Sequence, residues 1–405
     1  MAVASLFSLS FVAPNASAYE PACDACDASL CDADMDLFKQ CCNSGFEING
    51  WINAGFMGNT SSPNSKFHGP YNAVDRSNEL MLNQIYLIGE KALPRCGQGI
   101  GGRIDYLYGE DFFLAESIGM EKRQDGSPHW NNRYYGSAIP QAYVSLGNQQ
   151  LSVQMGHFYS VVGYEGLMAP DNFFYSKSYS YQFAGPFTHW GGQVNWNPST
   201  EWSVQAGIHN GWDALDRVSD KIGFVGKVRY DSQATGSWTS FAIVTGDDFN
   251  DGAGVAPTQE FTNRTRYSWL VGLPLTCKLD YVFHHWLGLQ EAGAADGGQA
   301  DWYGIDQYLT YSVNECTSLG MRFEWFRDEE GTRVGLNRPS NPNTPPFVGN
   351  FFSLSVGANY APTDYLVFRP ELRADWFDGS DVAQPFNDGQ DESQFMLGFD
   401  VIVRL

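Results

Sequence analysis

The stretch that most constrains the fold is a pair of alternating segments at residues 190–208. Every second residue there is apolar or glycine, in the order Trp190, Gly192, Val194, Trp196, Trp202, Val204, Ala206 and Ile208. The positions between them are mostly polar, and the interval 197–200 has turn composition. A period of two predicts two antiparallel strands with one apolar and one polar face. Trp196 and Trp202 flank the turn, where an aromatic belt belongs if the apolar face meets lipid.

The same pattern recurs along the chain and predicts sixteen strands, which is an even number. They are expected at 46–57, 79–91, 98–109, 137–146, 151–159, 186–196, 201–210, 220–230, 236–245, 264–273, 275–286, 302–311, 317–327, 350–360, 365–376 and 394–405. Abundant glycine (43 residues) and aromatic residues (15%), with few charged residues (17%), suit many short strands and turns better than helices. A mildly polar average composition is compatible with a membrane barrel, because alternation averages the two faces.

The intervals between these strands alternate in length. Long intervals near 58–78, 110–136, 160–185 and onward alternate with short ones near 92–97, 147–150, 197–200, 231–235, 274, 312–316 and 361–364. Short periplasmic turns on one rim and long extracellular loops on the other are typical of bacterial outer-membrane barrels. A soluble sandwich has no reason to sort its loops in this way. The predicted fold is therefore all-β, a transmembrane antiparallel up-and-down barrel of about sixteen strands.

Charged residues fall on the polar faces of the predicted strands. The expected pore-lining residues are Arg103, Asp105, Lys227, Arg229, Lys278, Asp280, Arg322, Glu324, Arg369, Glu371, Arg373 and Asp375. A charge on the lipid face at the bilayer midplane would cost about 2–4 kcal/mol, so the charged faces must point inward. A barrel of about sixteen strands leaves an aqueous channel.

Tyrosine and tryptophan cluster beside the short turns. We expect an aromatic girdle formed by Trp196, Trp202, Tyr230, Trp238, Tyr311, Tyr360 and Tyr365. The alternative is the general preference of these residues for strands.

The N-terminal region differs from the rest. Residues 1–18 are apolar and end in a small-residue cleavage pattern, which predicts a signal peptide without the usual positive start. Residues 19–45 predict a cysteine-rich periplasmic segment, and residues 46–405 the barrel. Disulfides are favoured over a zinc site, since exported cysteines usually oxidise and no second ligand pair follows.

Three further cysteines lie in or beside predicted short turns, where they could pin the N-terminal segment to the rim or remain unpaired thiols. The disulfide candidates are Cys23, Cys26, Cys31, Cys41, Cys42, Cys96, Cys277 and Cys316. Eight cysteines allow 105 full pairings, so none is assigned.

The sequence offers no catalytic constellation. It contains neither a nucleophile elbow nor a phosphate-binding glycine run, and its histidines lack metal-ligand spacing. We predict no enzyme activity, no catalytic residues, no metal and no cofactor. The net charge of −22 and the lack of a basic stripe argue against nucleic-acid binding.

The chain resembles the OmpL-like beta-barrel porin-2 family of bacterial outer-membrane proteins. The resemblance rests on Asp171–Tyr179 (DNFFYSKSY), Gly185–Gly192 (GPFTHWGG) and Asn210–Asp213 (NGWD). It implies a porin in the bacterial outer membrane and names no solute.

General porins of sixteen strands fold the loop after the fifth strand into the lumen. The resemblance thus makes the interval 160–185 a candidate pore constriction, with Glu165, Asp171 and Lys177. The alternative is a solvated outer loop held by Pro170 and Pro186.

These patterns predict a passive outer-membrane channel for ions and small hydrophilic solutes. The expected partners are outer-membrane lipid and those solutes, and a homo-oligomer is left open. The alternative is a structural or adhesive barrel with a plugged lumen and ligand-binding acidic loops.

Overall fold

The computed structural model describes residues 45–405 except 96, 124, 132–133, 217–218, 251–257, 336–340, 342–345 and 380–383. The predicted signal peptide and nearly all of the cysteine-rich segment, with its five cysteines and Cys96, lie outside the described residues. The domain boundaries predicted for that region therefore remain predictions.

The described chain is built almost entirely of strands. They are β1 (Phe46–Asn59), β2 (Glu79–Lys91), β3 (Gly99–Gly109), β4 (Gly136–Ala138), β5 (Ala142–Gly147), β6 (Leu151–Tyr159), β7 (Thr188–Trp196), β8 (Trp202–His209), β9 (Gly223–Asp231), β10 (Trp238–Asn250), β11 (Thr258–Pro274), β12 (Leu279–Gln290), β13 (Ala300–Asn314), β14 (Thr317–Asp328), β15 (Gly349–Thr363), β16 (Leu366–Gly379) and β17 (Ser393–Arg404).

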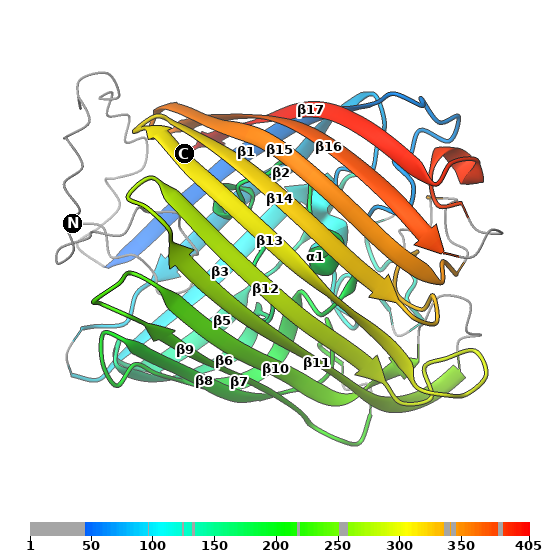
Figure 1. The fold of residues 1–405 in the computed structure, drawn as a ribbon. Coiled ribbons are helices and arrows are strands. Elements are labelled where there is room, and N and C mark those ends of the chain that lie inside the picture. The colour runs from blue at the N-terminus through cyan, green and yellow to red at the C-terminus, as the bar shows by residue number, and fades with distance from the viewer. Residues whose placement is uncertain are drawn as a thin grey trace.

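Each strand pairs antiparallel with its neighbours in the chain, and β1 pairs with both β2 and β17. The sheet therefore closes into a barrel (Figure 1). The seam runs from Trp51 opposite Arg404 to Asn59 opposite Met396. Closure leaves no unpaired sheet edge, which a spanning β-structure requires in lipid.

The predicted strand 137–146 is interrupted. β4 and β5 both pair with β3, so together they occupy one position in the wall and the barrel has sixteen positions. The break contains Pro140, which lacks the N–H that a continuous ladder needs. The predicted barrel of about sixteen strands is confirmed, with this one wall position divided.

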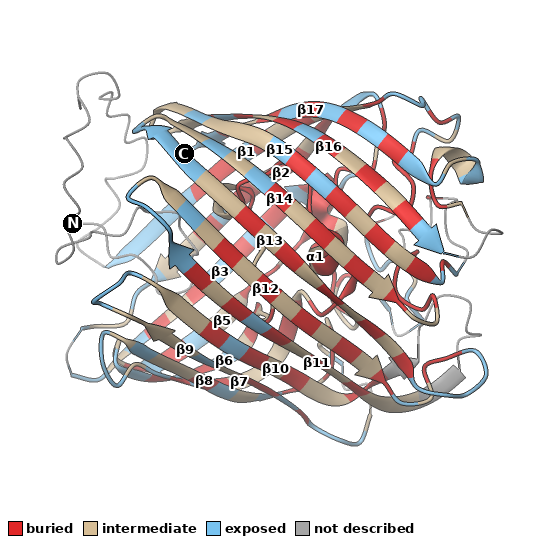
Figure 2. Cartoon of the chain, viewed as in Figure 1, coloured by how far each residue is buried: buried red, intermediate tan, exposed pale blue. Residues whose placement is uncertain are grey.

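The alternation of the sequence becomes an alternation of burial along the strands (Figure 2). The hairpin of β7 and β8 pairs Val194 with Ala206 and Trp196 with Val204, as the opening pattern predicts. Val194 and Trp196 are exposed on the outer face, whereas Gln193 and Asn195 are buried on the inner face. Outward residues of the other strands, such as Leu397 and Met155, give the barrel an apolar outer surface.

Loops are sorted by length between the two rims. The C-terminus lies at the rim that carries the short turns (Figure 1). The turn between β11 and β12 spans residues 275–278, so the strand predicted to start at residue 275 begins at Leu279. The strands β10 and β11 run past their predicted ends into the long-loop rim.

Short helices occur only inside the loops of the described chain: η1 (Glu110–Ala115), η2 (Ala169–Asp171), α1 (Tyr179–Phe183) and η3 (Asn387–Gly389). Among the described residues no helix has the length and apolar character needed to cross a membrane.

Candidate functional site

The loop between β6 and β7, residues 160–187, lies inside the barrel. We call it the lumen loop. It contains η2 and α1, and Figure 1 shows α1 within the ring of strands. Ser178 caps α1 by accepting a hydrogen bond on its hydroxyl from the Tyr181 N–H at 3.0 Å. Lys177 and Ser178 are only 4% and 0% exposed. The loop therefore narrows the lumen.

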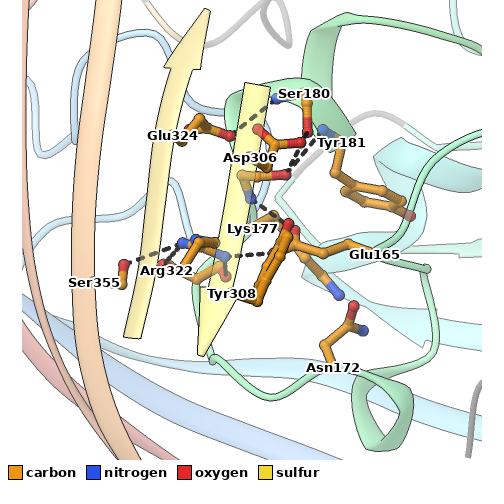
Figure 3. Close-up of polar contacts among 12 residues, drawn as sticks. Glu165, Asn172, Lys177, Ser180, Tyr181, Asp306, Tyr308, Arg322, Glu324 and Ser355 are labelled. Atoms are coloured by element: carbon orange, nitrogen blue, oxygen red, sulfur yellow. Dashed lines mark hydrogen bonds and ion pairs between the residues drawn. The ribbon is translucent and has the colours of Figure 1, made fainter. Parts of the chain in front are cut away.

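Arginines on the inner wall donate to the backbone carbonyls of the lumen loop. Arg322, which Figure 3 shows beside the loop, donates to the Ser176 carbonyl at 2.9 Å. Arg373 donates to the Lys177 carbonyl at 2.7 Å. Arg369 donates to the carbonyls of Ala169 and Asn172 at 2.9 and 2.5 Å. Arginine carries five donors in a rigid fork, so each of these side chains can hold the loop and a carboxylate together.

Carboxylates on the inner wall accept hydrogen bonds from backbone N–H groups and serine hydroxyls of the same loop. Glu371 accepts from the Ser176 N–H at 2.8 Å and from its hydroxyl at 2.6 Å. The Ser180 N–H donates to Glu324 at 3.2 Å and its hydroxyl to Asp306 at 2.6 Å (Figure 3). Ser176 and Ser180 of the SKSYS sequence thus attach the loop to the wall carboxylates.

These contacts define one side of the lumen, on β13, β14 and β16. We call it the charged wall, which consists of Asp306, Arg322, Glu324, Arg369, Glu371 and Arg373. Its arginines are also paired with carboxylates next to the wall, for example Arg369 with Asp400 and Arg373 with Asp375. All six side chains are at most 3% exposed, so they hold the loop instead of lining open water.

The three candidate constriction residues lie in the lumen loop but do not all face an opening. Glu165 is paired with Arg322 at 2.6 Å. Lys177 donates to the Gly166 carbonyl at 2.7 Å, and its ammonium lies 5.2 Å from the centre of the Tyr181 ring. Asp171 and Glu165 border a small pocket that is partly open to solvent. Their roles as constriction residues remain predictions.

Burial and neighbouring charges shift the pKa values of this loop. Burial lowers the pKa of Lys177 to about 8, partly offset by Asp111 and Glu165. Burial raises the pKa of Asp171 to about 6, partly offset by Lys177. Burial also acts to raise the pKa of Glu165, but Arg322 and Lys177 outweigh it and the pKa is lowered.

The inner face of β6, β7 and β8 differs from the charged wall. It carries four buried amide side chains, which we call the carboxamide wall: Gln154, Gln193, Asn195 and Gln205. Gln193 and Asn195 both donate to Gln154, at 3.4 and 3.3 Å, and Gln205 donates to Asn195 at 3.1 Å. Gln193, Asn195 and Gln205 belong to the polar face of the opening hairpin, but the sequence alone indicated no role for them or for Gln154.

The remaining predicted lining residues occupy three settings. Arg103 and Asp105 form a buried pair on β3 at 2.7 Å. On β9, Lys227 and Arg229 are half-buried on the inner face beside the carboxamide wall. Asp280 is exposed at the start of β12, whereas Lys278 lies in the turn before it and donates to the Val313 carbonyl.

The predicted girdle residues are placed on both faces. Trp196, Trp202, Tyr311 and Tyr360 are 44–49% exposed on the outside of the barrel, and the Tyr230 ring lies 4.9 Å from that of Trp202. Tyr365 lies in a short turn. Trp238 instead points inward, since it shares the inner-face spacing of buried Ser240, and the Arg229 guanidinium lies 4.1 Å from its ring centre.

The half of the lumen near the long loops holds an aromatic cluster. Tyr179 and Phe183 of α1 belong to one buried cluster with Trp302, Phe351 and other residues. The Trp302 indole N–H donates to the Ala184 carbonyl at 2.9 Å. Apolar packing therefore adds to the polar contacts that hold the lumen loop in place.

Lumen histidines bond to protein groups: His157 to the hydroxyl of Ser117, His189 to that of Ser160 and His284 to Asp306. In the part of the chain that the structure describes, no group of three or more His, Cys, Asp or Glu residues is arranged to hold a metal ion.

Comparison with protein families gives one match, to the family described as beta-barrel porin-2, OmpL-like, over residues 45–405. The search of curated proteins gives no match. Among solved structures, the outer membrane channel DcaP of Acinetobacter baumannii is similar at 11% identity and a TM-score of 0.59, covering 90% of this chain and 99% of that one.

Two other solved structures share the fold. The anion-selective porin from Comamonas acidovorans has 10% identity and a TM-score of 0.56, with 89% of this chain and 99% of that chain covered. OmpT of Vibrio cholerae, solved in a trimer form, has 8% identity and a TM-score of 0.54, with the same coverage. Identities this low establish the fold alone.

Proposed function

Because the chain belongs to the OmpL-like beta-barrel porin-2 family and forms an outer-membrane channel, we propose that it passes ions and small hydrophilic solutes by passive diffusion. A pore of this kind selects by its width and by the groups that line it. The lumen loop sets the width, because it fills the side of the barrel next to the charged wall.

One observation carries this proposal: the lumen loop is hydrogen-bonded to the charged wall, to β2 and to β11, whereas within the described chain no hydrogen bond joins it to the carboxamide wall. Its serines and carbonyls meet the charged wall, whereas the side-chain hydrogen bonds of the carboxamide wall run among its own members. A narrow polar passage beside the carboxamide wall is consistent with a small conductance and a low size limit for solutes.

Planar-bilayer recordings of the purified, refolded protein in potassium chloride test the proposal. We expect discrete current steps that are small for a barrel of sixteen strands, together with liposome swelling in small sugars but not in larger oligosaccharides. Protein that runs as a folded, heat-modifiable barrel on a gel but gives neither current nor swelling would overturn it.

That negative result would favour a second function, a plugged barrel whose long acidic loops bind ligands. The observation in its favour is the aromatic cluster around Tyr179 and Phe183, which packs α1 against Trp302 and Phe351. In that case the plug is the lumen loop itself.

We also propose that the outer surface meets lipid and further copies of the chain. The exposed outer residues supply the apolar area for both, and the OmpT structure in trimer form shows a barrel of this fold assembled in that way. Cross-linking in mild detergent measures the number of copies.

Disulfides at the short-turn rim form a further proposal. Cys277 and Cys316 lie in the neighbouring turns before β12 and β14. The Ser312 N–H donates to the Lys278 carbonyl at 2.8 Å, which holds these turns side by side. Non-reducing peptide mapping should recover both cysteines without free thiols.

A further inference from the structure

Five consecutive strands, β5 to β9, contain a single acidic residue. Asp231, the last residue of β9, is that residue, and the strands carry two cations, Lys227 and Arg229. The chain as a whole has a net charge of −22, with 46 acidic residues. This part of the wall therefore differs sharply in charge from the rest of the molecule.

The two cations of β9 are not equivalent. Arg229 has two partners: it forms an ion pair with Asp231 at 2.7 Å, and its guanidinium lies 4.1 Å from the centre of the Trp238 ring. For Lys227, the described residues provide neither a hydrogen bond nor an ion pair. Its side chain is half-buried on the inner face of the barrel. An ammonium group in this position can bind an anion in the lumen without first breaking an ion pair within the protein.

The carboxamide wall lies directly beside Lys227. Gln205 is opposite Lys227 in the pairing of β8 with β9, and its amide continues the chain of hydrogen bonds to Asn195, Gln154 and Gln193. Each amide can both donate and accept. Such groups can exchange their mutual bonds for bonds to solute hydroxyls with little net change in energy.

We propose that Lys227 and the carboxamide wall form a subsite for small monoanionic hydroxy acids. Lys227 binds the carboxylate, and the amides bind the hydroxyl groups along the remainder of the solute. A single uncommitted cation fits one negative charge, because Arg229 is already neutralised by Asp231. This inference rests on the proposed channel function and adds the class of solute.

Reversal potentials measured across bilayers in gradients of potassium gluconate test the role of the charge. Lys227→Gln should lower the gluconate-to-potassium permeability ratio by about threefold or more, since a nearby charge in a narrow passage is weakly screened. Lys227→Arg should retain the ratio. Lys278→Gln is the matched control, because it removes the same charge from a rim turn, and it should leave the ratio nearly unchanged.

An equal ratio in Lys227→Gln and the unmodified protein, with folding verified by heat-modifiable migration, overturns the inference. An equal fall in Lys227→Gln and Lys278→Gln does so as well, because the effect would then be one of overall rim charge.

The amides are tested separately by comparing gluconate with chloride. Gln205→Leu should reduce gluconate permeability severalfold and change chloride permeability little, since chloride has no hydroxyl groups to bind. An equal reduction of both overturns the hydroxyl-binding part. If the unmodified protein conducts no ion at all, the channel function itself fails, a result distinct from conduction without Lys227-dependent selectivity.

Discussion

The two sides of the lumen use polar residues in opposite ways. The charged wall contains six ionisable side chains that are almost completely buried, and they bond to the lumen loop and form ion pairs with each other. The carboxamide wall contains neutral amides that bond only among themselves, with the half-buried Lys227 at its edge. Both walls arise from the same alternation of apolar and polar residues.

This difference shows that an inner-face charge in a barrel need not mark the water-filled path. Burying a charge is costly unless it is paired and hydrogen-bonded. The charged wall meets that condition because its side chains form ion pairs and also hydrogen-bond to the serines and backbone carbonyls of the lumen loop. In the function proposed above, the side with fewer charges is the one along which solutes pass.

The largest effect should come from removing the element that separates the two walls. Replacing residues 163–185 with a short glycine–serine linker should raise single-channel conductance severalfold, because a barrel of sixteen strands has a wide interior. Bilayer recording measures this change. An unaltered conductance would mean that the lumen loop does not limit the passage.

The charged wall should be sensitive to the loss of one partner. Arg322→Met leaves Glu165 and Glu371 without their shared cation in a buried site, which typically costs about 3–5 kcal/mol. Urea unfolding in detergent or lipid vesicles measures the loss. Arg327→Met on the same strand breaks a half-exposed pair with Glu329 and should cost less than about 1 kcal/mol. Equal losses in the two variants would contradict the distinction.

Acidity should change how firmly the lumen loop docks. The pKa of Asp171 is raised to about 6 in the docked loop, so docking is strongest at low pH and weakens as the pH rises through that value. The pKa of Lys177 is lowered to about 8, so docking also weakens as the pH falls through about 8. Glu165, with its lowered pKa, stays ionised across this window.

Docking should therefore be weakest between about pH 6 and 8, and current fluctuations largest there. Recordings over a pH series check this expectation. Asp171→Asn should remove the change on the acid side and leave the alkaline side in place. A fluctuation level independent of pH in the unmodified protein would argue against it.

The smallest effect is expected in the carboxamide wall. Gln205→Met removes one hydrogen bond to Asn195, which keeps its own bond to Gln154, so the loss should be about 0.5–1.5 kcal/mol. The same urea titration measures it. A loss as large as that of Arg322→Met would erase the proposed difference between the two walls.

Much of the fold could be predicted from local sequence patterns. The alternation of apolar and polar residues locates each strand, and the lengths of the intervals assign the loops to the two rims. The predicted strands are found with shifted ends, and the interruption at Pro140 was foreseeable from its missing N–H. The inward position of Trp238 was also predictable by counting from Ser240. The girdle prediction placed Trp238 by its position beside a short turn, but the alternation of the strand is the better guide to the face on which a residue lies.

The contacts of the lumen loop could not be predicted in the same way. Ser176 meets Glu371, and Ser180 meets Asp306, across separations of 195 and 126 residues. No periodicity within one segment encodes such pairs. The resemblance to a family drew attention to the loop but not to Ser176 and Ser180, which make most of its hydrogen bonds to the charged wall.

The seam between β1 and β17 has a consequence for assembly. Asp400 on β17 pairs with Arg369 on β16, and Asn53 on β1 donates to the same carboxylate at 2.6 Å. Arg369 in turn holds the lumen-loop carbonyls of Ala169 and Asn172. Until the last strand arrives, Arg369 lacks its carboxylate and the first strand lacks its partner. Closure of the barrel therefore supplies the carboxylate that orients Arg369, and the same side chain holds the lumen loop, so closure and docking of the loop depend on a shared residue.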